Sequence, residues 1–154
     1  MQMTPSLPIK HILVPHGFDD NSEAALNYAV TLARTLGARV TVFHAFEIPS
    51  LGAPEVLVLA TDWTKQIADA AREHLQTIVA RARGAGGSVD AELRQGSAWR
   101  EVESFAKEAH VDLVVVGSHG RRGLPRALLG SVAEQIVRTA PCPVLVVRSA
   151  EHSG

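Results

Sequence analysis

The feature that most restricts the fold is a short, wholly apolar run that ends at a glycine. Residues 113–116 are Leu-Val-Val-Val, and Gly117 follows them directly. An uninterrupted run of β-branched residues is typical of a strand that is buried on both faces, as in parallel sheets covered by helices. The run therefore predicts a central strand of an α/β fold.

The loop after this strand is small and basic, and it leads to a helix start. The loop contains small, histidine and arginine residues and ends at a second glycine-serine pair, Gly130 and Ser131. The residues before this pair that matter here are Ser118, His119, Gly120, Arg121, Arg122 and Arg126. Ser131 and Glu134 have the spacing of a capping box, so we expect a helix to start at Ser131. Glycine lets an anion approach the main chain, and the N–H groups of a helix start attract it. The segment predicts a phosphate site, although its spacing matches neither a P-loop nor GxGxxG; the alternative is that the glycines only form a tight turn.

Further strands and helices are expected to alternate along the chain. The apolar patterns predict strands over residues 10–15, 40–46, 89–94, 113–116 and 144–148, and helices that start at Asp20, Asp62, Ser97 and Ser131. Asp20 and Glu23 have capping-box spacing, and Gly37 follows the first helix. Residues 89–94 alternate between apolar and charged, which indicates an edge strand. The class is therefore a doubly wound, open, parallel five-stranded α/β sheet with helices on both faces.

The connection over residues 47–61 is longer than most strand-to-helix loops, which have roughly two to six residues. It contains two prolines, a glycine and an apolar run. We expect either one irregular turn packed on the domain, or a lid or partner surface beside the carboxyl ends of the strands.

Composition bounds the class of protein. The 154 residues predict one domain with flexible tails at 1–8 and 149–154, and an apolar content of 46% with a net charge of -1 favours neither disorder nor a general nucleic-acid surface. The single cysteine, Cys142, lies between two prolines and is expected to be a packed turn residue in a reducing compartment. The first eight residues do not resemble a signal peptide and no run has the length of a membrane span, so we expect a cytoplasmic protein.

The glycine string, GxxG followed by nine residues and Gly-Ser, resembles the nucleotide-binding motif of the universal stress protein family. The resemblance runs from the ILVP sequence at Ile12 to the PCPVLVV sequence that ends at Val147, and GSHG and LLGSVAEQIV are its most specific parts. It implies a five-stranded sheet of order 3-2-1-4-5, cytosolic homodimers, and binding of ATP or related adenine nucleotides by some members. In that order, the loop at His16 and Gly17 faces Gly117 and Gly120 across the topological switch point.

The resemblance also implies which residues form the site. Gly117, Gly120, Gly130 and Ser131 are expected to receive ribose and phosphates, with Val132 as a wall. The strand ends are expected to border the adenine or complete the site: Pro15, His16, Gly17, His44, Ala45, Val116, Ser118 and His119. Arg121 and Arg122 add charge for a polyphosphate in this interpretation; the alternative is that they are simply solvated. The expected ligand is ATP or AMP, with cyclic AMP as an alternative, and Mg²⁺ as a candidate companion.

The sequence departs from the family pattern at Gly17, where nucleotide-binding members typically have an aspartate. Three outcomes are open: weaker binding, a different adenine ligand such as AMP or a cyclic nucleotide, or no nucleotide. Asp19 and Asp20 are close in sequence, but a carboxylate two residues further along a loop need not reach the same point. If Asp19 faces the phosphates, it either holds a divalent ion or repels them.

Other residues of the chain allow functions other than nucleotide binding. His16, His44 and His119 at adjacent strand ends allow a zinc site, although the compact ligand spacing of zinc motifs is absent. Ser118 and Ser131 lack a recognisable base and acid, so we expect no enzyme, apart from slow nucleotide hydrolysis or self-phosphorylation. The apolar strand Val144–Val147 is expected to pair with its copy in a homodimer, or else to be covered by loops. The leading hypothesis is a regulatory protein that binds adenine nucleotide and an unknown client; the alternative is a family member without nucleotide that acts as a protein-interaction module.

Overall fold

The structure, a computed structural model, describes residues 8–48, 54–118 and 129–149. Strands and helices alternate along these residues as the sequence predicts. The elements in chain order are β1 (His11–Pro15), α1 (Asp20–Leu36), β2 (Arg39–Phe46), α2 (Pro54–Gly84), β3 (Val89–Gln95), α3 (Ala98–Glu108), β4 (Leu113–Gly117), α4 (Ser131–Thr139) and β5 (Val144–Val147).

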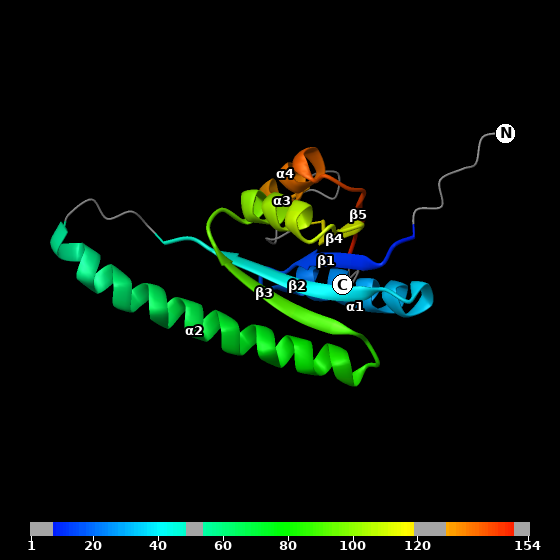
Figure 1. Cartoon of the computed structure of the whole chain (residues 1–154), viewed down its shortest axis with the longest axis horizontal. Coiled ribbons are helices and arrows are strands. Elements are labelled where there is room, and N and C mark those ends of the chain that lie inside the picture. The colour runs from blue at the N-terminus through cyan, green and yellow to red at the C-terminus, as the bar shows by residue number, and fades with distance from the viewer. Residues whose placement is uncertain (1–7, 49–53, 119–128, 150–154) are drawn as a thin grey trace, which may run out of the picture.

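The five strands form one parallel sheet in the order β3-β2-β1-β4-β5. Helices α1 and α2 cover one face, and α3 and α4 cover the other (Figure 1). The doubly wound class, the strand order and the placement of β3 at an edge are therefore confirmed. The order places β1 between β2 and β4, so the direction of the chain across the sheet reverses at β1.

Alternate residues of the central strands enter two separate hydrophobic cores. In β1, Ile12 and Val14 join the core under α1 and α2, whereas Leu13 joins the core under α3 and α4. In β4, Leu113 and Val115 join the first core and Val114 the second. Each of these side chains is fully or almost fully buried and contributes about 1.5–3 kcal/mol of transfer free energy. The prediction of a central strand buried on both faces is confirmed.

Two predicted helix caps are wrong in detail. Asp19, not Asp20, caps α1, because its Oδ1 accepts the Ser22 N–H at 2.8 Å. Helix α4 begins at Ser131 as predicted, but Gly130 is its N-cap and the capping box does not form. The Glu134 carboxylate instead accepts a hydrogen bond from Arg138, one turn further along, at 2.8 Å. Gly37 ends α1 with φ 69°, a left-handed value that glycine adopts without steric cost, as predicted.

Helix α2 begins at Pro54, eight residues before the predicted cap at Asp62. Residues 54–61, expected to be irregular, are therefore helical. Proline suits a first helical turn because the N–H that it lacks has no intrahelical partner there. The amino-terminal half of α2 extends past the end of the sheet (Figure 1), and Trp63 and Ile67 on it are exposed.

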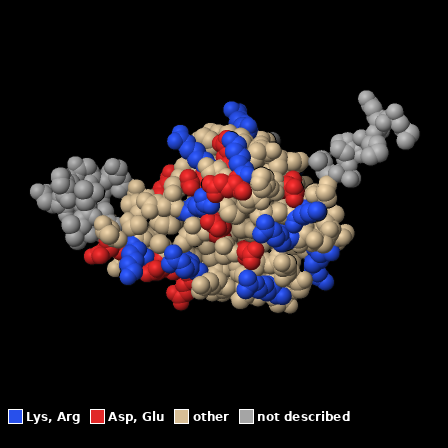
Figure 2. Space-filling view, viewed as in Figure 1, with Lys and Arg blue, Asp and Glu red and all other residues tan. Residues whose placement is uncertain are grey.

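The surface shown in Figure 2 carries acidic and basic side chains interspersed, without a large patch of one sign. The distribution agrees with the near-zero net charge of the chain. In the described ranges, no helix combines the length and the apolar character needed to span a bilayer.

Candidate functional site

A cavity of about 710 Å³ opens at the carboxyl ends of β1, β2 and β4 and is closed by the start of α4. This is the topological switch point, where ligands of open α/β sheets bind. Ten of the residues predicted for the site line the cavity: Pro15, His16, Gly17, His44, Ala45, Val116, Gly117, Gly130, Ser131 and Val132. The carboxyl ends of parallel strands lie along one edge of the sheet, which is why residues so far apart in sequence converge here.

Five other predicted residues are not among the lining residues that the structure describes. Ser118 is buried, with an exposed fraction of 3%, and its main chain joins β4 to its neighbours: Ser118 N–H donates to the Val147 carbonyl at 3.0 Å, and its own carbonyl accepts the Gly130 N–H at 2.9 Å. His119, Gly120 and Arg122 lie outside the described residues, as does Arg121. Their predicted roles stay predictions.

The cavity also has lining residues that were not assigned to it from the sequence. Polar ones come from the start of α1 and the first turn of α4: Asp19, Asn21, Ser22 and Glu134. Apolar ones come from β2, α3, α4 and the residues just before α4: Phe43, Ala98, Val102, Leu129, Ala133 and Ile136. The helical stripe that places Ala98 and Val102 on the inner face of α3 was visible in the sequence, but not their place beside the strand ends.

Gly117 has a structural reason that was not expected. A Cβ at this position would lie 2.5 Å from the carbonyl oxygen and 2.8 Å from the carbonyl carbon of Asn21. The space that a side chain would fill is therefore taken by the first turn of α1, rather than left open for an anion. Gly117 lines the cavity because β4 and α1 pack this closely at its rim.

His16 is held by hydrogen bonds on every side. Its main-chain N–H donates to the Phe43 carbonyl at 2.6 Å, its Nδ1 accepts the Phe18 N–H at 3.0 Å, and its Nε2–H donates to the Glu23 carboxylate at 3.1 Å. The same carboxylate accepts a hydrogen bond from Arg81 of α2 at 2.6 Å. Burial lowers the pKa of His16, although the Glu23 carboxylate acts in the opposite direction. The imidazole is therefore neutral near pH 7. Both ring nitrogens are engaged, so His16 is not free to bind a metal.

His44 lines the cavity from β2 and is tied to the same loop. Its Nδ1–H donates to the His16 carbonyl at 2.7 Å. Burial lowers the pKa of His44 as well, so this ring is also neutral near pH 7. In the part of the chain that the structure describes, no three His, Cys, Asp or Glu side chains are grouped to hold a metal ion. The zinc hypothesis also involves His119, which lies outside that part.

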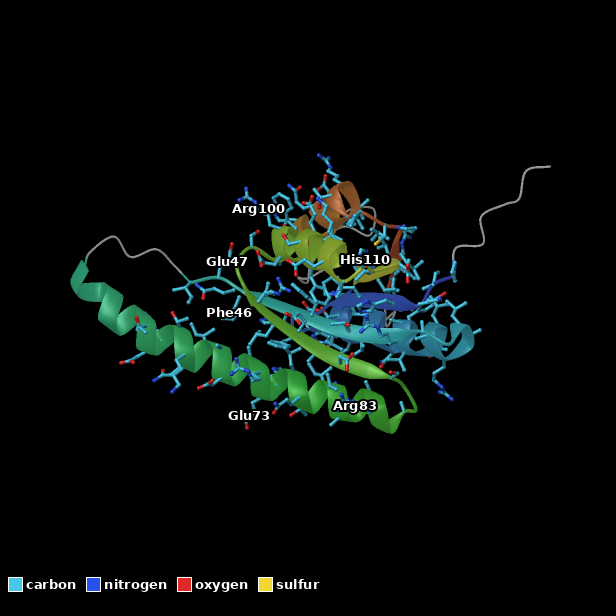
Figure 3. The ribbon with its side chains drawn as sticks, viewed as in Figure 1. Phe46, Glu47, Glu73, Arg83, Arg100 and His110 are labelled. Carbon is cyan, nitrogen blue, oxygen red and sulfur yellow. The ribbon has the colours of Figure 1, made fainter. Side chains whose placement is uncertain are left out.

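Phe18 turns its side chain away from the cavity toward α2. Its ring stacks between His44, with centroids 3.9 Å apart, and His74 of α2, with centroids 4.1 Å apart. The backbone of Phe18 is left-handed, with φ 62°. His110 is the other non-glycine residue of positive φ that the described ranges contain, and it lies in the turn after α3 (Figure 3), where such values are common at helix ends.

The Asp19 carboxylate lies beside Gly17 at the cavity wall. A Cβ on Gly17 would be 3.1 Å from Asp19 Oδ2. Ser22 holds the loop closed, because its Oγ accepts the Gly17 N–H at 2.9 Å while its own N–H donates to Asp19 Oδ1. Among the described lining residues, Asp19 and Glu134 carry negative charge, and none is a lysine or arginine.

The β5 edge and Cys142 lie outside the cavity lining. Strand β5 pairs with β4 along one side, and its four residues are half-buried. Cys142 is partly buried against the core under α3 and α4, and burial raises the pKa of its thiol. The expectation of a packed turn residue agrees with this environment.

The fold and the cavity together define an α/β protein with a cavity at the switch point of a five-stranded parallel sheet. The sequence profile of the Universal stress protein family matches residues 8–148. The chain belongs to this family.

Relatives and solved structures agree with that assignment. Universal stress protein MJ0531 of Methanocaldococcus jannaschii is 32% identical over 90% of this chain and 82% of its own length. The structure of universal stress protein UspA from Lactobacillus plantarum superimposes with a TM-score of 0.79 at 26% identity, covering 91% of this chain and 98% of that one. The structure of hypothetical protein MJ0577 gives a TM-score of 0.81 at 25% identity, covering 94% and 99%.

Proposed function

We propose that this universal stress protein binds an adenine nucleotide, ATP or AMP, in the cavity at the switch point. The observation that carries the proposal is the convergence of ten predicted residues, from separate parts of the chain, on one cavity large enough for a nucleotide. Structures of this fold have been solved as complexes with cAMP and with dAMP, which supports an adenine ligand in this chain by analogy.

The walls of the cavity suit the two ends of a nucleotide. Phe43, Ala45 and Val102 offer an apolar surface for the base on the β2 and α3 side. The first intrahelical bond of α4 runs from the Glu134 N–H to the Gly130 carbonyl, so the N–H groups of Ser131, Val132 and Ala133 precede the helical ladder. These groups attract phosphate. Because Asp19 and Glu134 are acidic, a ligand with several phosphates is expected to bring Mg²⁺ with it.

The proposed role is regulatory rather than catalytic. Nucleotide occupancy biases the conformation of the loops around the cavity and thereby the binding of a client protein, provided that the ligand favours one conformation. We further propose that the whole chain is one domain, that it works in the cytoplasm, and that it forms a homodimer through the exposed edge of β5, Val144–Val147. Pairing of that edge with a second copy removes an unpaired apolar strand from solvent.

The second candidate is a protein-interaction module without nucleotide. Two observations favour it: glycine at position 17, where nucleotide-binding relatives are expected to have aspartate, and the absence of a lysine or arginine from the described cavity lining. In this case the cavity would stay empty of nucleotide and the surface alone would carry the function.

The experiment that separates these candidates is identification of what the purified protein releases on denaturation. Protein freed of its expression tag is denatured, and the supernatant is analysed by mass spectrometry for nucleotides and by elemental analysis for zinc. Folded protein is then titrated with ATP and AMP. Release of a nucleotide on denaturation, or binding of ATP or AMP in the titration, supports the leading proposal. Release of zinc in stoichiometric amount would instead support a metal site at the histidines. If the protein neither releases nor binds any of these ligands, the interaction module is the remaining candidate.

A further inference from the structure

The β1–α1 loop presents one unpaired carboxylate oxygen to the cavity. Asp19 Oδ1 is occupied by the Ser22 N–H, which it accepts at 2.8 Å as the cap of α1. Among the residues that the structure describes, Asp19 Oδ2 has no hydrogen-bond donor and no ion-pair partner, and the residue lines the cavity. Its neighbour Gly17 has no side chain to compete for the same space.

Gly17 and Asp19 lie on the same side of the loop and both line the cavity, as residues two apart often do. The ring of Phe18 points the other way and lies between His44 and His74, outside the lining. The backbone of Phe18 is left-handed, with φ 62°. A left-handed phenylalanine is strained, and such strain persists where the surroundings enforce a particular geometry. The two stacked rings and the hydrogen bond from the Phe18 N–H to His16 supply that enforcement.

The order of the strands indicates which part of a nucleotide meets Asp19. The apolar wall for the base is at β2 and α3, and the helix start that attracts phosphate is at β4 and α4. Strand β1 lies between β2 and β4 in the sheet, and Asp19 belongs to the loop that leaves β1. The middle of a nucleotide is its sugar. A ligand that spans the cavity therefore places its ribose at the Asp19 carboxylate.

We propose that Asp19 is a specificity-determining residue that selects ligands with a free ribose diol. Its Oδ2 accepts a hydrogen bond from the 2′- or 3′-hydroxyl group, and its charge disfavours a phosphate ester at the same place. The site thus takes a 5′-nucleotide such as AMP in preference to 2′-deoxy, 3′-deoxy or 3′,5′-cyclic analogues. The inference rests on the proposed function and deepens it.

The test is calorimetric titration of the full chain with AMP, 2′-deoxy-AMP, 3′-deoxy-AMP and cyclic AMP. Because a hydrogen bond to a charged group contributes more than a neutral one, AMP is expected to bind roughly tenfold or more tightly than at least one deoxy analogue. Asp19→Ser keeps a good helix cap but has no oxygen at the position of Asp19 Oδ2. The ratio of the affinities for AMP and for the deoxy analogue should therefore fall to about one. Asp19→Asn keeps the cap through its single oxygen but turns an NH2 group, which cannot accept a hydrogen bond, toward the cavity, so the preference should fall by about fivefold.

Asp20→Asn is the matched control. Asp20 is exposed in the same first turn of α1 but does not line the cavity, so this variant removes an equal charge and should keep the wild-type preference. Thermal unfolding of each variant checks the helix cap, and Asp19→Asn decides the question if Asp19→Ser does not fold.

The possible failures are distinguishable. Equal affinity of the wild type for AMP and both deoxy analogues, or an unchanged preference in the Asp19 variants, would overturn the role of Asp19 and leave nucleotide binding intact. Failure of the wild type to bind AMP or ATP at all would overturn the proposed function together with this inference.

Discussion

Replacement of Gly117 by alanine is the perturbation whose outcome the structure determines most directly. The added Cβ would lie 2.5 Å from the Asn21 carbonyl oxygen, which belongs to the backbone of α1 and has no flexible end to move aside. The two atoms must separate by about 1 Å to reach an ordinary contact near ~3.5 Å. Either α1 shifts as a body over the first core, or β4 does, and both are tightly packed.

Overpacking of this kind costs typically 1–3 kcal/mol, and the backbone contact places Gly117→Ala at the upper end, about 2–3 kcal/mol. With a urea dependence of roughly 1–3 kcal/mol per molar for a small domain, the midpoint of unfolding should fall by about 1–2 M. A loss of about 2–3 kcal/mol is a large part of the total free energy of unfolding, which is roughly 5–15 kcal/mol for such a domain.

Gly84→Ala provides the matched control, because it is the same chemical change with the opposite expected sign. Gly84 ends α2, and no atom lies within 4 Å of a Cβ built there. Alanine is the better helix former and restricts the unfolded chain, so the free energy of unfolding should rise by up to about 1 kcal/mol. Equal urea midpoints for Gly117→Ala and the wild type would refute the close packing of β4 against α1.

Two further predictions concern the loop beside the cavity and the buried histidines. Phe18→Ala loses both stacking contacts, worth about 0.5–1.5 kcal/mol each, and keeps the left-handed strain, whereas Phe18→Gly loses the same contacts and releases that strain. The glycine variant should therefore be the more stable of the two in urea unfolding, which is the reverse of the usual order. A more stable alanine variant would contradict the presence of strain at Phe18. Because burial lowers the pKa of His11, His16 and His44, the unfolded chain binds more protons than the folded chain once the pH falls below about 6.5. The free energy of unfolding should then decrease between pH 7.5 and 5.5, above the range in which most carboxylates titrate, and a constant or rising value would show that these rings are not held neutral.

The fold was predictable because its signals are local and repeated. The apolar run of residues 113–116, the glycine after α1 at Gly37 and the alternating pattern of β3 each identify one element without reference to the rest. Once strands and helices alternate, few topologies remain, and the resemblance to a known family indicated which one. The order β3-β2-β1-β4-β5 then brought the predicted strand ends together.

The helix starts were less predictable because neighbouring residues compete for the same role. Asp19 and Asp20 are both suitable caps, and the choice between them depends on the bond from the Ser22 N–H, which is a property of the folded loop. Glu134 has the right spacing from Ser131 but pairs with Arg138. Residues 54–61 contain a proline that suggested a loop, although proline is equally at home in a first helical turn.

The parts of the site that were missed depend on backbone geometry that no sequence pattern shows. The left-handed conformation of Phe18 is unusual for an aromatic residue, and the place of Asp19 on the cavity wall depends on the path of this folded loop. Likewise, Gly117 was expected to expose main chain to a phosphate, but its absent side chain makes room for Asn21. Only the packing of α1 against β4 distinguishes these two reasons for a glycine.

The proposed function requires the start of α4 to hold the phosphates of an adenine nucleotide, and titration of Gly130→Ala with ATP and AMP measures whether it does. Gly130 has φ -60° and ψ 156°, values that alanine adopts without strain, so the variant should fold as the wild type does. A methyl group at the cavity wall beside the helix start should weaken binding by roughly tenfold or more, since it keeps the phosphates from the main-chain N–H groups. Affinity equal to that of the wild type, in a variant of unchanged stability, would show that the phosphates do not lie at the start of α4.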